Sequence, residues 1–186
     1  RLFESQAAQV EQLRREAHED RLTGLPHRAH FMQRFAAVLA DDAQADGGSL
    51  LLIRVADLAD VNRDLGREAT DRALRMLADV LRGWPQDGAL AGRLNGADFA
   101  LALPNMTSGA APTAHESAAR VASALRSALS GNSERFVVHL GAALWSHGAA
   151  PSAGALLARA DQALARAEGL APFAAEVDAE AGDAMA

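Results

Sequence analysis

Several residue types that often carry enzyme chemistry are missing from this chain. Its 186 residues include no Cys and no Tyr, and all 18 basic residues are Arg. Schiff-base amines, P-loop lysines, thiolate nucleophiles, disulfides and phenolic acids are therefore excluded. The remaining candidates are carboxylates, which divalent ions prefer as ligands, and Asn side chains, which offer both a donor and an acceptor.

Histidine is the other residue type with obvious chemistry, and its spacing indicates no metal site. Ligand pairs on one helix face are usually spaced as in HxxxH, and no such spacing occurs here. The six histidines are scattered along the chain: His18, His27, His30, His115, His139 and His147.

Composition and charge narrow the class of protein. A chain that is 49% hydrophobic and 23% charged is typical of a folded domain, and no apolar run reaches the roughly 18 residues that cross a bilayer. The net charge of −6 argues against nucleic-acid binding, which needs a clustered positive surface. Because the chain opens at Arg1 without a signal peptide, we expect a piece of a longer protein.

Apolar segments and turn signals indicate the strands. The run at 49–55 is short and apolar on both sides, so it predicts a buried central strand. Segments 90–94 and 99–103 flank Asn95-Gly96, a pair that favours a hairpin because both residues tolerate positive φ. Residues 136–145, with Gly141 in the middle, predict a strand pair.

Helical spacing fills the gaps between these strands. It predicts helices at 26–39, 58–65, 69–81, 114–129 and 152–168, with a loop at 105–113 and a frayed tail after Pro172. The order of elements, with its hairpins, predicts an α+β fold with a mostly antiparallel sheet covered by helices.

The first 19 residues form a separate connector helix with an apolar seam. The seam follows alternating spacings of three and four, as in a parallel coiled coil, and predicts a homodimer through this helix. The alternative is an amphipathic helix packed on its own domain. The seam residues are Phe3, Gln6, Val10, Leu13 and Ala17.

Four segments resemble the motifs of GGDEF domains, the diguanylate cyclase modules of bacterial signalling, in family order and spacing. Asp20 to Arg28 resembles the motif DxLTxLxNR, and Asn62 to Asp71 resembles NDxxGHxxGD. Arg93 to Phe99 resembles RxGGDEF, and Ala160 to Leu164 resembles ADxAL. The resemblance implies a palm-like fold over 20–172, followed by an acidic, Ala-rich tail or linker at 173–186.

The resemblance also implies a reaction, and this chain departs from it. Active members of the family join two GTP molecules using two divalent ions held by carboxylates. Those carboxylate positions fall on Arg54 and Ala97, and within the motif Asn95, Gly96, Ala97, Asp98, Phe99 only Asp98 keeps an acid. A guanidinium repels a dication, so we expect no metal, no cofactor and no enzymatic activity.

Of the positions that contact the nucleotide in the family, this chain has lost the phosphate-binding residues and retained the guanine-reading residues. The phosphate-binding cations fall on Ala59, Glu168 and Pro172, which weakens attraction for a triphosphate. The guanine-reading positions keep Asn62 and Asp71 as a remnant pocket. The alternative is structural: Asn62 stabilises the turn before Gly66, and Asp71 favours the first turn of the next helix.

Product inhibition in the family uses an RxxD motif before the hairpin strand. The corresponding segment here runs from Gln86 to Ala89, and neither end matches. We therefore expect no inhibitory site for cyclic di-GMP at this surface.

The amino-acid sequence of the hairpin strand further resembles that of the LapD-type inner-membrane receptors of cyclic di-GMP. That resemblance implies a degenerate, regulatory GGDEF domain on the cytoplasmic side, preceded by a HAMP segment and followed by an EAL domain of the same protein. Neither direct membrane contact nor nucleic acid is expected for this segment. One alternative is a domain that binds GTP or GDP and controls an attached EAL phosphodiesterase; an active cyclase is less favoured.

Overall fold

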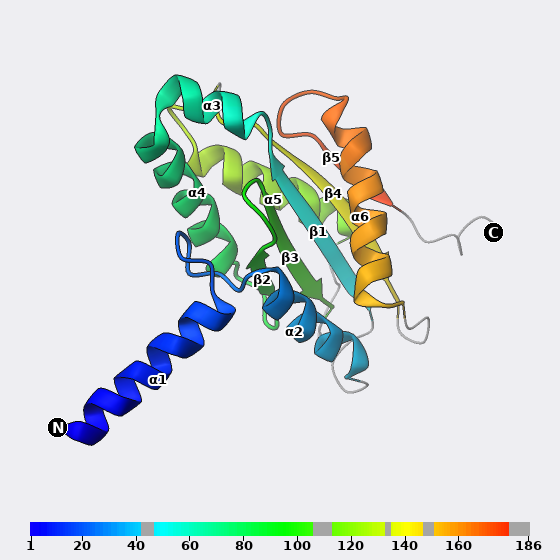
Figure 1. Ribbon diagram of the computed structural model, residues 1–186. Coiled ribbons are helices and arrows are strands. Elements are labelled where there is room, and N and C mark those ends of the chain that lie inside the picture. The colour runs from blue at the N-terminus through cyan, green and yellow to red at the C-terminus, as the bar shows by residue number, and fades with distance from the viewer. Residues whose placement is uncertain (42–46, 106–112, 133–134, 147–150, 179–186) are drawn as a thin grey trace.

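Five strands form one mixed sheet in the order β2-β3-β1-β4-β5 (Figure 1). The computed structural model describes residues 1–41, 47–105, 113–132, 135–146 and 151–178. Neighbouring strands are antiparallel except β4 and β5, which are parallel. The fold prediction, a mostly antiparallel sheet covered by helices, is confirmed. The strands are β1 Gly48–Val55, β2 Leu90–Arg93, β3 Asp98–Pro104, β4 Val138–Trp145 and β5 Ala175–Asp178.

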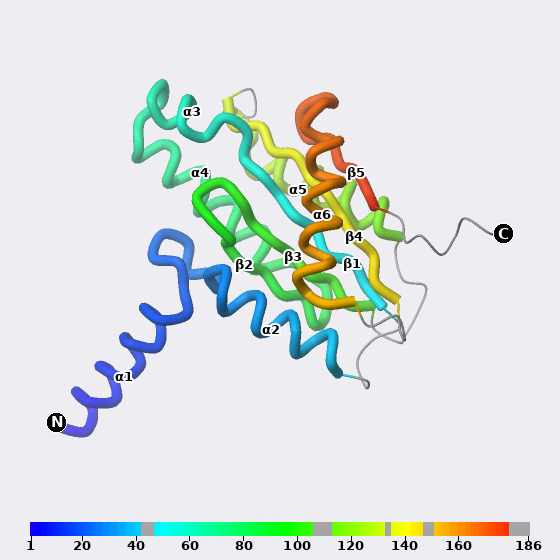
Figure 2. The backbone as a smooth tube through the Cα atoms, turned by 45° about the vertical axis from the view of Figure 1, so that its right-hand side comes forward, coloured from blue at the N-terminus to red at the C-terminus, as the bar shows by residue number. Residues whose placement is uncertain are grey.

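Helices cover both faces of the sheet. In Figures 1 and 2, α2 and α6 lie on one face, and α4 and α5 lie on the other. Each face has its own apolar core, one containing Phe31 and Leu164 and the other containing Leu77 and Leu125. The helices are α1 Leu2–His18, α2 Arg28–Ala40, α3 Leu58–Leu65, α4 Arg67–Arg82, α5 Ala114–Ala128 and α6 Ala153–Glu168.

The central strand β1 is apolar throughout because it faces a core on each side. Leu50 and Leu52 pack in the cluster beneath α2 and α6, whereas Leu51 and Ile53 pack in the cluster beneath α4 and α5. Successive side chains of a strand point to opposite faces, so a strand covered on both faces reads as a continuous apolar run.

Helix α6 approaches the sheet closely at a glycine. A Cβ built on Gly141 of β4 would lie 2.2 Å from the carbonyl oxygen of Ala160 and 2.2 Å from the backbone nitrogen of Leu164. Only glycine leaves room for the helix backbone here. This contact sets the height of α6 above β1 and β4, and hence the position of the polar side chains along it.

Helix α1 projects from the domain with all its residues exposed (Figure 1). The seam residues Phe3, Val10 and Leu13 are 86%, 53% and 61% exposed. The alternative of a helix packed on its own domain is therefore wrong. No helix in the described ranges is long and apolar enough to cross a membrane.

Two predicted elements differ from the structure. Residues 136–145 form the single strand β4 and its approach, not a strand pair. After Pro172, the chain was expected to fray, yet Ala175–Asp178 pairs with β4, and the Phe173 N–H donates to the carbonyl of Val138 at 2.9 Å. Most of the predicted loop 105–113, His147 and residues 179–186 lie outside the described residues.

Candidate functional site

The hairpin between β2 and β3 is closed by the side chain of Asn95. Its Oδ1 accepts hydrogen bonds from the N–H groups of Ala97 and Asp98, both at 3.0 Å, and its Nδ2 donates to Asp98 at 2.8 Å. This is the local hydrogen bonding that makes Asn favourable in turns. The hairpin predicted from Asn95-Gly96 thus forms, but the predicted reason is wrong: neither residue has a positive φ, and the Asn95 side chain closes the turn instead. The hairpin fixes Asp98 as the first residue of β3.

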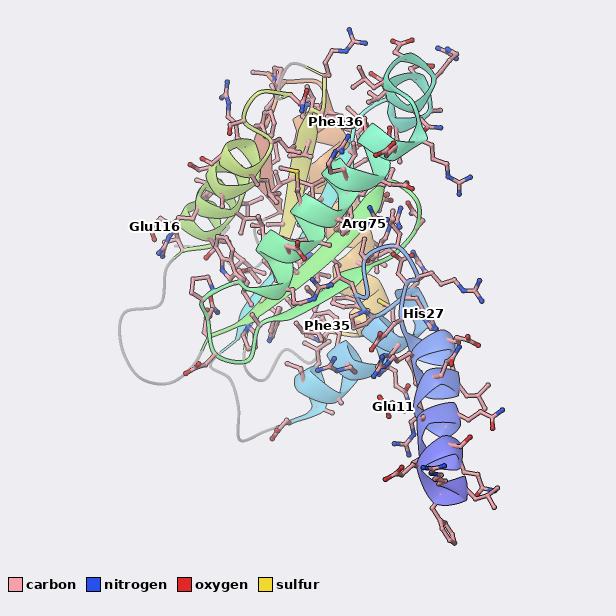
Figure 3. All side chains as sticks on the ribbon, turned by 90° about the vertical axis from the view of Figure 1, so that its left-hand side faces the viewer. Glu11, His27, Phe35, Arg75, Glu116 and Phe136 are labelled. Carbon is pink, nitrogen blue, oxygen red and sulfur yellow. The ribbon has the colours of Figure 1, made fainter. Side chains whose placement is uncertain are left out.

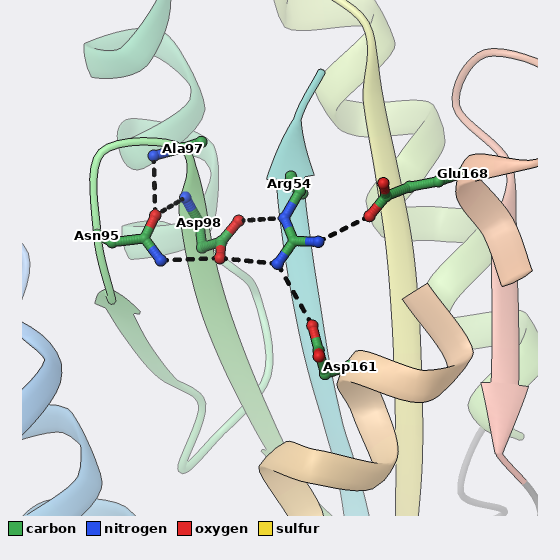
Figure 4. Close-up of polar contacts among 6 residues, drawn as sticks. All are labelled: Arg54, Asn95, Ala97, Asp98, Asp161 and Glu168. Atoms are coloured by element: carbon green, nitrogen blue, oxygen red, sulfur yellow. Dashed lines mark hydrogen bonds and ion pairs between the residues drawn. The ribbon is translucent and has the colours of Figure 1, made fainter. Parts of the chain in front are cut away.

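Arg54 lies at the centre of a cluster of three carboxylates (Figure 4). Asp98 is its register partner on β3 and accepts two hydrogen bonds, from Nε at 2.7 Å and from Nη2 at 3.0 Å. From α6, Glu168 accepts from Nη1 at 2.7 Å and Asp161 from Nη2 at 3.3 Å. A single guanidinium thereby links β1, β3 and α6.

The inner half of this cluster is shielded from solvent and the outer half is not. The Asp98 side chain is 10% exposed, whereas those of Asp161 and Glu168 are 58% and 41% exposed. The hydrogen bonds that Arg54 donates to Asp98 raise the pKa of Arg54 above its ordinary value, against the opposing effect of burial, and the bond to Glu168 adds to the rise. The bidentate ion pair between Arg54 and Asp98 is therefore the strongest interaction in the cluster.

As arranged, these residues do not fit a divalent cation. The carboxylates that could serve as ligands surround a fixed positive charge, which would repel a dication at the same place. Among the described residues, no group of three His, Asp or Glu side chains is placed to hold a metal ion. From the sequence, Asp98 was counted as the only acid here, Glu168 was placed at a phosphate-binding position and Asp161 was not singled out. The seven-residue spacing of these two acids places both on one face of α6, but it does not indicate that this face meets Arg54.

Asn62 and Asp71 line one cleft, of about 620 Å³, between α3, α4 and the hairpin. Ala59 lines it as well, together with Arg67 and residues 95–97. Within the described chain, neither the Asn62 nor the Asp71 side chain has a hydrogen-bond partner; the N–H of Gly66 instead donates to the backbone oxygen of Asn62. Both side chains are free to meet a ligand.

The turn after α1 is tied to the hairpin by a partly buried ion pair. Asp20 accepts from the N–H and hydroxyl of Thr23, at 2.9 and 2.7 Å, and from Nη1 of Arg93 at 2.9 Å. Burial favours the neutral carboxyl, but these hydrogen bonds prevail and lower the pKa of Asp20. Arg93, only 10% exposed, also donates from Nη2 to the carbonyl of Gly96 at 2.9 Å.

The remaining predicted site positions lie apart from both sites. Pro172 lines a separate cavity of about 500 Å³ with Phe173 and Arg126, beside α5. Gln86, at the predicted position of the inhibitory motif, donates from Nε2 to the carbonyl of Pro104 at 2.9 Å. The structure does not bring these residues to Arg54 or to the cleft at Asn62.

Residues 17–169 match the family model described as diguanylate cyclase, GGDEF domain. The chain belongs to the GGDEF family. Among its curated relatives, the diguanylate cyclase TpbB of Pseudomonas aeruginosa is 35% identical over 99 residues, covering 53% of this chain and 23% of TpbB. The diguanylate cyclase DgcP of the same species is 30% identical over 166 residues, covering 86% and 24%. The chain thus spans about a quarter of these relatives.

Solved GGDEF structures share the fold. The coiled coil and GGDEF domain of DgcB from Caulobacter crescentus, in complex with c-di-GMP, has a TM-score of 0.73 at 22% identity, covering 95% of this chain and 93% of that one. Vibrio cholerae LapD, comprising S helix, GGDEF and EAL, gives 0.72 at 24%, covering 96% and 41%. The GGDEF domain of TpbB gives 0.66 at 28%, covering 86% and 94%.

The names of the curated relatives contradict the expectation that this chain is not an enzyme. All three relatives are diguanylate cyclases at 30–35% identity, which points toward enzymatic function. The expectation rested on two substituted positions, Arg54 and Ala97, and on Asp98 being the sole acid. The structure removes that last premise, because α6 brings two further carboxylates to the same place.

Proposed function

We propose that this GGDEF domain is a regulatory module that relays a signal from α1 to the sheet within a larger cyclic di-GMP signalling protein. One observation carries the proposal: α1 leaves its apolar seam exposed, while the turn at its base is joined through Arg93 to the hairpin. A helix whose residues are all exposed is suited to receive a partner, and its base is suited to pass on a movement.

The contacts beyond Arg93 extend toward α6. Arg93 binds Asp20 of the turn and the carbonyl of Gly96 in the hairpin, and the same hairpin holds Asp98 against Arg54. Arg54 in turn contacts both acids of α6. A shift at the base of α1 therefore has a continuous set of polar contacts along which to act.

The receiving partner of α1 is a second copy of the chain in this proposal. Exposed apolar residues at alternating spacings of three and four form the seam of a parallel coiled coil. We expect the native chain to sediment as a dimer and Val10→Asp to sediment as a monomer. Ala8→Asp, on the outward face of the same helix, should remain dimeric. A native chain that is monomeric at all concentrations would contradict this part of the proposal.

Coupling is tested by hydrogen exchange at the hairpin. Dimerisation through α1 should change the protection of the amides of residues 94–98, so Val10→Asp and the native chain should differ there. In an Arg93→Met background, where the link to Asp20 and Gly96 is cut, Val10→Asp should no longer alter the same amides. If Val10→Asp changed the exchange of these amides equally in the native and the Arg93→Met backgrounds, the relay would be refuted.

The larger protein is proposed to be membrane-bound, with an EAL domain as the partner of this domain. Support comes from the fold shared with LapD, whose solved segment joins an S helix, a GGDEF domain and an EAL domain. The test is to read the full-length coding sequence that contains this chain. Membrane spans before it and an EAL domain after it would support the proposal, and their absence would contradict it.

A second candidate function is binding of GTP or GDP, favoured by Asn62 and Asp71, which line one cleft and whose side chains have no hydrogen-bond partner among the described residues. Asn can both donate to and accept from a guanine edge, and a carboxylate can accept two of its N–H groups. Calorimetry should show heat with GTP or GDP, and none with ATP, in the native chain. Asp71→Asn should abolish this heat, and Asp79→Asn, on the same helix, should not.

A separate incubation with GTP and Mg²⁺ or Mn²⁺ tests whether cyclic di-GMP forms. This is the activity that the names of the relatives state.

A further inference from the structure

Arg67 lines the same cleft as Asn62 and Asp71, and its side chain has no ion-pair or hydrogen-bond partner in the described part of the chain. Asp71 follows it by four residues in α4, and side chains at this spacing are neighbours on one helix face. Glu68 and Arg72 form an ion pair across the same spacing at 3.8 Å, but Arg67 and Asp71 do not. The cleft therefore has an unengaged cation beside an unengaged carboxylate.

The other nearby cations are already engaged. Arg93 also lines the cleft, but its side chain is largely buried and donates to Asp20 and to the carbonyl of Gly96. Arg54 lies outside the lining and contacts three carboxylates. Phosphate groups are bound best by Arg or Lys side chains that are free to donate to their oxygens. Among the described residues that line the cleft, Arg67 is the one cation that remains free for a ligand.

A guanine base has two adjoining edges that match this pair of side chains. Its N1–H and N2–H groups are donors that one carboxylate can accept, and its O6 and N7 atoms are acceptors for a bidentate guanidinium. The two edges meet at O6, so side chains about 5–6 Å apart on one helix face can hold both. The ribose and phosphates are attached at N9, across the purine, so a base held in this way directs its phosphates away from α4.

We propose that Arg67 makes this cleft a site for the guanine base itself, with Arg67 donating to O6 and N7 while Asp71 accepts from N1–H and N2–H. The motif NDxxGHxxGD has His at the position of Arg67, so the arginine is a departure of this chain. The proposal rests on the second candidate function, binding of guanine nucleotides, and adds that the ligand is selected by its base and not by its phosphates. Guanosine, GMP and GTP should therefore bind alike. Adenine is rejected because its N6 amino group is a donor and would face the donors of Arg67.

The test is calorimetry without added metal, using ligands that differ in one feature. 7-Deaza-GTP has a C–H group in place of N7 and so lacks one of the two acceptors for Arg67. Losing a hydrogen bond from a charged donor should weaken its binding to the native chain about tenfold relative to GTP. In Arg67→Met the two ligands should bind equally, because the donor is gone.

Arg75→Met is the matched control. Arg75 lies about two turns further along α4, on the side of the molecule that Figure 3 presents to the viewer. It is exposed like Arg67, but it is not among the residues that line the cleft. This variant should keep the preference for GTP over 7-deaza-GTP. Because both arginines are exposed, neither substitution should impair folding, which a urea melt of each variant checks.

The possible failures separate this inference from the function on which it rests. Equal binding of GTP and 7-deaza-GTP by the native chain, or an unchanged preference in Arg67→Met, would overturn the role of Arg67 while guanine-nucleotide binding stands. Binding of GTP without binding of guanosine would overturn selection by the base alone. An absence of heat with every guanine compound would contradict the second candidate function, and this inference with it.

Discussion

Removing the guanidinium of Arg54 should destabilise the domain by about 2–4 kcal/mol. Arg54→Met keeps the length of the side chain but leaves three carboxylates facing one another without a cation. Breaking a fully buried ion pair costs about 3–5 kcal/mol. Because the Arg54 side chain is 33% exposed, solvent screens part of this, which lowers the expected figure. The exposed contacts with Asp161 and Glu168 add at most about 1 kcal/mol each.

Urea denaturation at neutral pH measures the effect, and a double-mutant cycle assigns it. Asp98→Asn combined with Arg54→Met should lose less stability than the two single losses added, with a coupling energy of about 1–3 kcal/mol. Arg63→Met is the matched control, because Arg63 contacts Asp60 at 2.7 Å with its side chain 71% exposed. It should cost under about 0.5 kcal/mol. A coupling near zero, or equal losses at Arg54 and Arg63, would refute the reasoning.

Three further predictions concern the core, the helix contact and acid stability. Phe99→Ala, at a side chain with no exposure, should cost about 3–5 kcal/mol in urea melts. Gly141→Ala should cost about 1–3 kcal/mol by overpacking against α6, whereas Gly154→Ala, where a Cβ meets nothing within 4 Å, should be neutral or stabilising. The lowered pKa of Asp20 means that its stabilisation is complete above the ordinary value of 3.8 and disappears as the pH falls below it; Asp20→Asn should flatten the acid limb of a stability–pH curve.

Local signals in the sequence were sufficient for the elements that carry the site. The apolar run at 49–55 identified β1 because a strand covered on both faces needs apolar residues throughout. Asn95-Gly96 identified the hairpin because turn chemistry is confined to a few neighbouring residues. In both cases, the residues that determine the structure are adjacent in the chain, which is the condition under which a single sequence is informative.

Contacts between segments far apart in the chain could not be predicted from the sequence. Asp161 and Glu168 are 107 and 114 residues from Arg54, and no local pattern indicates that they meet it. Strand β5 was missed for a related reason. Its four residues are only half-buried, and it is held by pairing with β4 and by Arg159, which donates to the Asp178 carboxylate at 3.0 Å. The rings of His18 and His30, with centroids 4.5 Å apart, come together because the backbone turns back between Glu19 and Pro26.

The contact at Gly141 and the cluster at Arg54 are two consequences of one helix position. The missing Cβ at Gly141 lets the backbone at Ala160 reach β4, and the next residue along α6 is Asp161. A helix lifted by a methyl group at this glycine would carry both of its acids away from the guanidinium, while Asp98, which lies on the sheet, would stay. The losses at Gly141 and Arg54 therefore overlap: once α6 has moved, only the pair with Asp98 remains to be broken, so the two substitutions together should cost less than the sum of their separate costs.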